Sequence, residues 1–238
     1  MSPWVISDVD GCVLPNPPQP PPPPALADLA AGVRAVGRFS LCSGRSAPYV
    51  LAVRDVLGAG APVLAEYGGL LAHSVNRVEP LPSLREVAGW RRLIRRRLLE
   101  AGVMEQAVEE VGKSVVVTLV PLPGGTFPAL RVSVARALRG LPHQVADSQS
   151  AVDVLPPGLD KGVGLRWWAE VCGAYLRPAC AIGDSVTDLD MLRLVGRPAC
   201  PANAAAEVRA FVAATPGGLV AQEEATAGVA ALLRRCCT

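Results

Sequence analysis

The sequence predicts an α/β protein, built on a doubly wound parallel sheet with a smaller α+β domain inserted into it. Short apolar runs alternate with helix-like segments over residues 1–79, and the same alternation returns over residues 157–238. Between them, over residues 80–156, long helical segments and neighbouring strands replace that rhythm. We therefore expect residues 1–79 and 157–238 to form one core, interrupted by a separate domain at 80–156.

The first part of the core begins with a short buried strand that ends at Ile6. Residues 15–24 are almost all proline, which excludes a helix or central strand and favours stiff polyproline II. We interpret this run as a rigid loop, with partner binding through PxxP as the alternative. The helices expected next are 25–37 and 48–57, and the strands are 39–42, 62–66 and a returning hairpin strand at 70–73.

The inserted domain opens with a helix over 84–100, whose apolar residues form one stripe and whose arginines at 91–97 form a solvated face. A nucleic-acid helix is the alternative interpretation of those arginines. The remaining elements are expected to be a strand at 114–120, a helix at 128–138 and a hairpin of 143–146 with 151–155 around Ser148.

The second part of the core resumes the alternation of helices and strands. The helices are expected at 161–171, from 188 onward, at 204–213 and through 233, and the strands at 179–182, 198–201 and 219–221.

Composition limits the classes of function. Half of the 238 residues are hydrophobic, so a sizeable core is available, and the net charge of +2 gives no electrostatic reason to expect nucleic acid or an acidic membrane surface as a partner. The sequence shows neither a signal peptide nor an apolar run of the roughly 18 residues that a spanning helix needs. We expect a soluble cytoplasmic protein, either monomer or homodimer.

The seven cysteines include no C-x-x-C pair, so neither a zinc site nor a disulfide framework is predicted. We interpret them as small buried apolar side chains. The alternative is that Cys12 or Cys42 is a redox-sensitive neighbour of a functional site.

Two aspartates follow the first strand. Asp8 and Asp10 are two residues apart, and on an extended backbone such side chains point to the same side. Two close carboxylates repel each other unless a cation or a shared proton neutralises them, and Mg²⁺ prefers such oxygen ligands. Two solvent-facing aspartates in a turn are the simpler alternative.

A second pair of aspartates, Asp184 and Asp188, follows the strand expected at 179–182. The carboxyl ends of parallel strands border the crevice where α/β proteins bind ligands, so both pairs are expected to converge there.

Four segments in order resemble the signatures of the haloacid dehalogenase (HAD) superfamily of phosphotransferases. They are Asp8-x-Asp10-Gly11, Ser43-Gly44-Arg45 after an apolar strand, Lys161-Gly162, and Gly183-Asp184-x-x-Thr187-Asp188. The resemblance implies a Rossmann-like core, and the insert is similar to the small C2B-type cap of archaeal-type phosphoglycolate and sugar-phosphate phosphatases. Tyr67 stands where the similar Glu-Asn-Gly-Gly segment has Asn.

The resemblance also implies the site residues. Asp8 would be the nucleophile that forms an aspartyl-phosphate, and Asp10 would be the general acid and base. The implied Mg²⁺ ligands are Asp8, Asp10, Asp184 and Asp188, and the implied phosphate-binding residues are Ser43, Gly44, Arg45, Lys161, Thr187 and Asn203. Arg45 either holds phosphate or braces its loop. Whether Asn203 contacts the substrate is also left open. Cys12 and Thr187 replace the usual Thr and Asn.

The function that follows is a Mg²⁺-dependent phosphatase acting on a small phosphorylated metabolite, of the phosphoglycolate or sugar-phosphate type, including mannosyl-3-phosphoglycerate. The alternatives are a phosphomutase of the same superfamily and a catalytically inactive phosphate-sensing binding protein. The insert is expected to cover the site and set specificity, with Lys113 and the arginines of its first helix as available cations.

Overall fold

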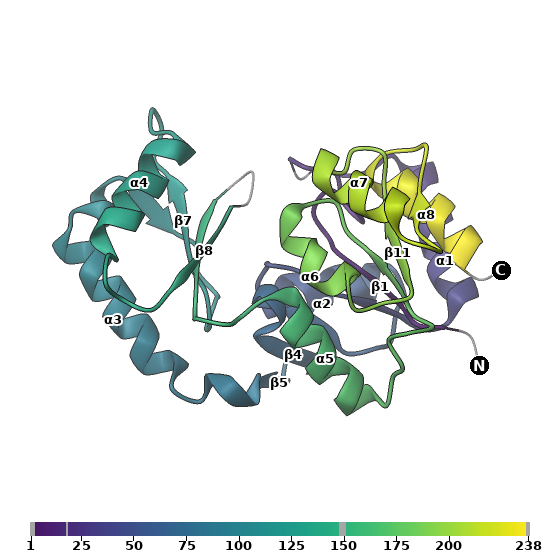
Figure 1. Cartoon of the computed structure of the whole chain (residues 1–238), viewed down its shortest axis with the longest axis horizontal. Helices are drawn as coiled ribbons and strands as arrows, with labels where there is room; N and C mark the ends of the chain where they lie inside the picture. The colour runs from purple at the N-terminus through teal and green to yellow at the C-terminus, as the bar shows by residue number, and fades with distance from the viewer. Residues whose placement is uncertain (1–2, 18, 148–150, 237–238) are drawn as a thin grey trace. The chain divides into compact units, whose positions relative to one another are not determined.

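The computed structural model describes residues 3–17, 19–147 and 151–236, which form two compact units (Figure 1). The core unit comprises Met1–Glu79 and Asp160–Thr238, and the smaller unit comprises Pro80–Leu159. The turn predicted around Ser148 lies outside the described residues. No helix in the described part of the chain is both long and apolar enough to cross a lipid bilayer.

The core unit contains a five-stranded parallel sheet in the order β12-β11-β10-β1-β2. Its strands are β1 (Val5–Ser7), β2 (Phe39–Leu41), β10 (Cys180–Ile182), β11 (Arg197–Cys200) and β12 (Leu219–Val220). The central strand β1 is buried at every residue and pairs with β10 on one side and β2 on the other. The parallel α/β sheet predicted from the apolar runs is therefore confirmed.

Helices cover both faces of this sheet. They are α1 (Pro23–Val36), α2 (Ala47–Val56), α5 (Lys161–Cys172), α6 (Leu189–Leu192), α7 (Ala206–Ala214) and α8 (Ala225–Cys236). Apolar side chains of α5, α6 and α7 pack in one cluster with Ile6 and Ala181 of the sheet. Because strand side chains alternate, Cys180 points to the opposite face, where it meets the end of α8. Helices α1 and α8 pack side by side (Figure 1).

Two local predictions were wrong. Helix α1 begins at Pro23, although residues 15–24 were expected to be non-helical. Proline is tolerated in the first turn of a helix, because its missing N–H would have no partner there and its fixed φ is already helical. Strand β3 (Val63–Ala65) does not extend the parallel sheet as a full strand, and only one parallel bridge joins Cys42 to Leu64.

Strand β3 instead pairs antiparallel with β4 (Leu70–Ser74), as the predicted hairpin requires, and β5 (Arg77–Pro80) completes a separate three-stranded sheet. The short 3-10 helix η1 (Glu66–Gly68) makes the turn of this hairpin.

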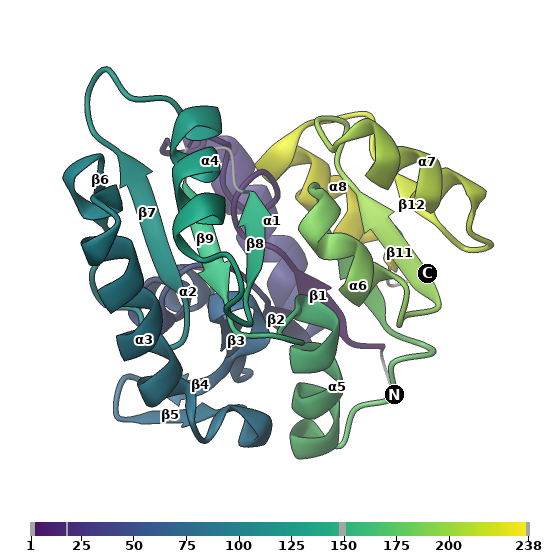
Figure 2. The ribbon, with the colours of Figure 1, turned by 60° about the vertical axis from the view of Figure 1, so that its left-hand side comes forward.

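The smaller unit is an antiparallel sheet in the order β6-β7-β9-β8, with α3 and α4 packed on one face (Figure 2). Its elements are α3 (Val87–Glu100), β6 (Ala107–Glu109), β7 (Val117–Pro121), α4 (Phe127–Ala137), β8 (Gln144–Asp147) and β9 (Val152–Leu155), with short 3-10 turns at Pro82–Leu84 and Val103–Glu105. Strand β6 was not predicted. Three residues are too few for an alternating pattern, and only the pairing with β7 defines it.

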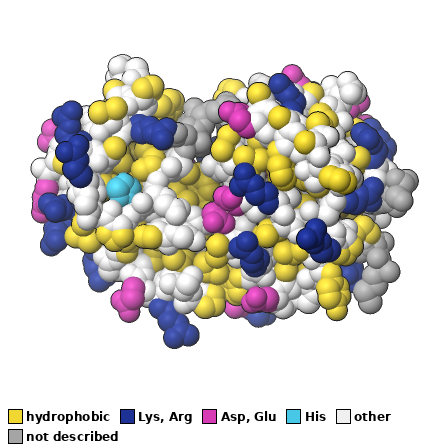
Figure 3. Space-filling view, viewed as in Figure 1, with side chains coloured by type: hydrophobic (Ala, Val, Ile, Leu, Met, Phe, Trp, Pro, Cys, Tyr) yellow, Lys and Arg dark blue, Asp and Glu magenta, His cyan; other side chains and the backbone are white. Residues whose placement is uncertain are grey.

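Several cations of this unit pair with acidic residues of the same unit. Arg91 and Arg95 both pair with Glu109, at 3.2 and 2.8 Å. Lys113 was expected to be available for a ligand, which is wrong. Its Nζ is buried and donates to Thr118 Oγ1 at 2.7 Å, with Glu110 and Asp153 carboxylates at 3.3 and 3.6 Å. On the face drawn in Figure 3, Lys and Arg side chains are scattered among acidic ones rather than gathered in one patch.

Candidate active site

Two neighbouring strands deliver the acidic residues to one end of the core sheet. Strands β1 and β10 are in register, with Ser7 opposite Ile182, and both end there. Asp8 follows directly, and its N–H donates to Ile182 O at 2.9 Å. Asp184 follows Gly183, where a Cβ would lie 2.4 Å from Asp188 Cβ, so this close approach requires glycine. The predicted convergence of Asp8 and Asp184 at the carboxyl ends is present.

Lys161 lies between two of these carboxylates. As the first residue of α5, it places Nζ 2.8 Å from Asp8 Oδ1 and 2.6 Å from Asp188 Oδ1. Its side chain is only 2% exposed. Burial acts to lower the pKa of Lys161, but the Asp188 and Asp8 carboxylates outweigh it and raise that pKa well above its usual value. The lysine is therefore a permanent buried cation.

Asp188 is fully buried, and both of its carboxylate oxygens are engaged. Oδ1 accepts from Lys161, while Oδ2 accepts from the N–H groups of Asp184 and Ser185 at 3.0 and 2.9 Å. The Ser185 hydroxyl also donates to Oδ2, at 3.0 Å. Asp188 thus fixes both the loop that carries Asp184 and the position of Lys161.

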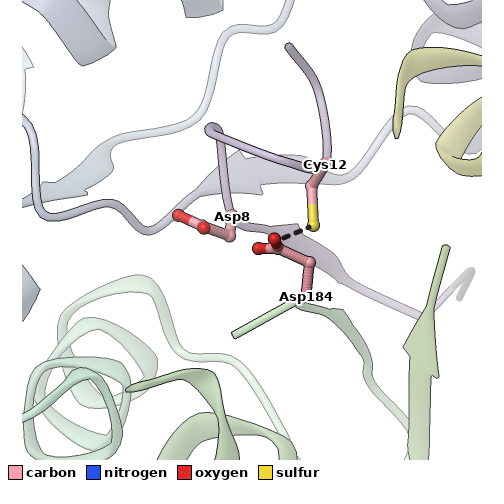
Figure 4. Close-up of side chains that lie close together, drawn as sticks. All are labelled: Asp8, Cys12 and Asp184. Carbon is pink, nitrogen blue, oxygen red and sulfur yellow. Dashed lines mark hydrogen bonds between the residues drawn. The ribbon is translucent and has the colours of Figure 1, made fainter. Parts of the chain in front are cut away.

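Asp8, Cys12 and Asp184 form a compact group whose ligand atoms all lie within 4.8 Å of one another (Figure 4). Burial, followed by the charge of Asp188, raises the pKa of Asp184 to about 7. Burial is also the main reason that the pKa of Asp8 is well above its usual value. The hard carboxylate oxygens of Asp8 and Asp184 are ligands that suit a divalent cation, whose charge would add to that of Lys161.

Cys12 was not predicted to belong to this group. Its Sγ points toward Asp184 Oδ1, 3.9 Å away, because the chain turns back at Gly11 with φ of +80°. A Cβ at Gly11 would lie 2.1 Å from Asp184 Oδ2, so only glycine permits this turn. Burial, then Asp184, raises the pKa of the Cys12 thiol well above its usual value, which keeps the thiol neutral. Two sequence signals concerned this position: Cys replaces the usual Thr, and Cys12 was an alternative candidate for a redox-sensitive neighbour of the site.

Asp10 is not part of that group and pairs with Arg45. The guanidinium donates through Nε to Asp10 Oδ2 and through Nη2 to Oδ1, both at 2.9 Å. The sequence argument placed both carboxylates on one side of an extended strand, but β1 ends at Ser7 and the period of two does not continue into the turn. Arg45 therefore braces Asp10 in this structure.

The remaining predicted residues surround these groups. Ser43 is buried; its N–H donates to Leu64 O at 3.0 Å, and its Oγ accepts from Arg45 N at 3.2 Å. Gly44 lies against the Tyr67 ring, 2.7 Å from where a Cβ would be, so the ring requires glycine there. This packing role for Tyr67 was not foreseen.

Thr187 and Asn203 hold loops together. Thr187 Oγ1 and Ser185 Oγ lie 2.7 Å apart. Asn203 Nδ2 donates to Gly11 O at 2.8 Å, and its Oδ1 accepts from Ala225 N at 2.7 Å. Asn203 therefore ties the loop of Asp8 and Asp10 to the start of α8.

Comparison with known proteins places this arrangement in a family. The sequence model of haloacid dehalogenase-like hydrolases matches residues 133–233. A phosphoglycolate phosphatase of Methanopyrus kandleri is 27% identical, over 99% of this chain and 97% of its own length. A solved Thermoplasma acidophilum structure, 20% identical, superposes with a TM-score of 0.79 over 99% of this chain and 98% of that one. These matches support assignment of the chain to the HAD superfamily.

The other relatives agree with this assignment. A phosphoglycolate phosphatase of Methanothermobacter thermautotrophicus is 26% identical, over 71% of this chain and 72% of its own length. The sucrose-phosphatase of Synechocystis sp. PCC6803, 17% identical, shares the fold with a TM-score of 0.68 over 99% of this chain and 98% of that one. The names of the two phosphoglycolate phosphatases support phosphatase activity of the HAD type for this chain.

Proposed function

We propose that this HAD phosphatase uses Mg²⁺ to hydrolyse a small phosphate monoester, with Asp8 as the nucleophile that forms an aspartyl-phosphate. The observation that carries the proposal is the position of Asp8 at a strand end, beside the Lys161 cation and the Asp184 carboxylate. A carboxylate can attack phosphorus directly, and the phosphoryl oxygens then need positive charge around them. Lys161 supplies one such charge at 2.8 Å from Asp8.

The close approach of the buried Asp8 and Asp184 carboxylates supports a divalent-cation site. Asp8 and Asp184 would hold Mg²⁺ with their oxygens, and the bound ion would supply positive charge to the phosphoryl group. Asp188 was predicted as a further ligand, but both of its oxygens already accept hydrogen bonds. We assign it instead to positioning Lys161 and the Asp184 loop.

Asp10 serves as the general acid and base in this proposal. Its carboxyl would protonate the leaving oxygen of the ester and afterwards accept a proton from the attacking water. The bidentate hydrogen bonds from Arg45 fix the plane of that carboxyl, so Arg45 is a positioning residue. The Ser43 hydroxyl and nearby N–H groups would bind the phosphoryl oxygens.

The favoured substrate is phosphoglycolate, since two relatives that match most of this chain carry that name. Sugar phosphates, including mannosyl-3-phosphoglycerate, form the second group to test. We propose that residues 80–156, which form most of the smaller unit, select between them.

The test is release of inorganic phosphate from a panel of phosphate monoesters, with Mg²⁺ and with excess EDTA. We expect turnover to require the metal and to be fastest on phosphoglycolate. Rapid acid quenching followed by mass spectrometry of the Asp8 peptide should detect one added phosphoryl group. Full activity in EDTA, or a phosphoryl group on another residue, contradicts the mechanism.

Asp8→Asn provides the matching variant. An amide oxygen is a poor nucleophile, so kcat should fall by several orders of magnitude while the circular dichroism spectrum stays unchanged. Asp190→Asn is the control, because that carboxylate is on the exposed side of α6, paired with Arg193. A folded Asp8→Asn protein that keeps more than about a tenth of the activity excludes Asp8 as the nucleophile.

A further inference from the structure

Two buried cysteines meet on the face of the core sheet opposite the cluster formed with α5, α6 and α7. Cys180 is the first residue of β10 and Cys236 is the last residue of α8, 56 positions further along the chain. Their sulfurs lie 2.8 Å apart, about 0.8 Å more than in a disulfide. Both side chains are almost completely buried. No sequence signal linked them, since their spacing is that of no known motif.

Positive charge surrounds Cys236. The Arg197 guanidinium donates to the carbonyl oxygens of Cys236 and Arg235, at 3.1 and 3.2 Å. The hydrogen bond with Cys180, together with Arg197 and Arg235, lowers the pKa of the Cys236 thiol despite its burial. Burial instead raises the pKa of Cys12 and Cys42, the two cysteines that the sequence had suggested as redox-sensitive. A thiolate is the form that attacks a disulfide. Cys236 is therefore a better nucleophile than Cys12 or Cys42.

We propose that Cys180 and Cys236 form a reversible disulfide that ties α8 to the central strand β10, with a small disulfide such as oxidised glutathione as the oxidant. The Cys236 thiolate attacks one glutathione sulfur, and the first glutathione leaves as a thiolate. Cys180 then loses its proton and attacks the Cys236 sulfur, and the second glutathione leaves. The two protein thiols lose two electrons in total, and the oxidant gains them as two thiols.

The order of these steps follows from the fold. Cys236 is in the last turn of α8, and helix ends open locally at low cost, so a small oxidant can reach it there. Cys180 is paired on both sides within the sheet, with Val5 and Arg197, so it stays in place and resolves the mixed disulfide. Closing the bond removes freedom from the unfolded chain over the 56-residue separation, which stabilises the fold.

The experiment compares the whole chain after oxidised glutathione and after dithiothreitol. Intact mass should fall by two hydrogens on oxidation, and proteolytic mapping should join the peptide of Cys180 to that of Cys236. The midpoint of thermal unfolding should rise by about 5–10 °C in the oxidised protein and return on reduction. A map that joins other cysteines, or none, overturns the proposal.

Cys237 is the matched control, because it adjoins Cys236 in the sequence and lies outside the described residues. The bond and the rise in Tm should persist in Cys237→Ser and vanish in Cys236→Ser. The reverse pattern would overturn the assignment to Cys236. Cys180→Ser tests the other cysteine of the pair. If that variant fails to fold, the proteolytic map of the oxidised wild-type protein still shows whether the two cysteines are joined.

Discussion

Replacing Lys161 with methionine removes the positive charge at the centre of the acidic site and leaves a side chain of similar length. The Asp8 and Asp188 carboxylates, at 2.8 and 2.6 Å, then lose their shared cation. Their side chains are only 8% and 0% exposed, so water cannot replace the lost charge. We expect Lys161→Met to destabilise the core and to abolish turnover.

Removing one partner of a buried ion pair costs about 3–5 kcal/mol of unfolding free energy. For a chain of this size each kcal/mol corresponds to about 2–4 °C, so Tm should fall by about 6–20 °C. In the proposed site Mg²⁺ would supply charge to Asp8, so saturating Mg²⁺ should recover part of that loss.

The measurement is differential scanning calorimetry at pH 8, with Mg²⁺ and with EDTA. Lys113→Met is the matched control, because Lys113 is the other lysine with Nζ buried between carboxylates, in the smaller unit. It should also lower the stability of its unit, but without any recovery in Mg²⁺. A Lys161→Met protein whose Tm falls by less than about 2 °C, or equal Mg²⁺ effects in both variants, would refute the reasoning.

Two further predictions concern Arg45 and Asp184. Arg45→Lys keeps the positive charge but loses the bidentate hydrogen bonds that orient the Asp10 carboxyl. We therefore expect kcat on phosphoglycolate to fall by about 10- to 100-fold. On p-nitrophenyl phosphate, whose leaving group needs no proton, kcat should change little, and equal losses on both substrates would exclude positioning of Asp10. Because the pKa of Asp184 is raised from 3.8 to about 7, the metal-free protein should lose stability as pH rises through that range. Mg²⁺ competes with the proton on Asp184, so the Mg²⁺ affinity measured by calorimetry should increase by up to about tenfold per pH unit as the pH rises toward 7. An affinity that stays constant from pH 5.5 to 8 would contradict the assignment of Asp184 as a Mg²⁺ ligand.

The sequence alone determined the elements of the core and the ends of its strands. Short apolar runs such as that before Asp8 are too short for a typical helix and therefore favour buried strands, and their alternation with helices favours a parallel sheet. Because side chains after parallel strands meet at one edge, the approach of Asp184 to Asp8 also followed. These conclusions depend only on the local pattern of apolar residues and on the direction of the chain, and both can be inferred from the sequence.

Only the tertiary structure decided which charged side chains form ion pairs with each other. Asp10 and Arg45 are 35 positions apart, so no local rule selects this pair, and the family resemblance had suggested only the approach of Lys161 to Asp8. The period of two misplaced Asp10 because it holds within a strand and not in the turn after it. Lys113 was taken for an available cation because burial by distant strands cannot be inferred from its neighbours in the sequence.

The contact between Cys180 and Cys236 shows the same limit most clearly. Each residue reads as a small apolar side chain at the end of its own element, and that local interpretation is correct. Their meeting requires the order of strands in the sheet and the packing of α8 against it, both of which depend on contacts between residues far apart in the chain. Sequence fixes such elements through local energetics, whereas the pairing of distant side chains is decided by how the whole core packs.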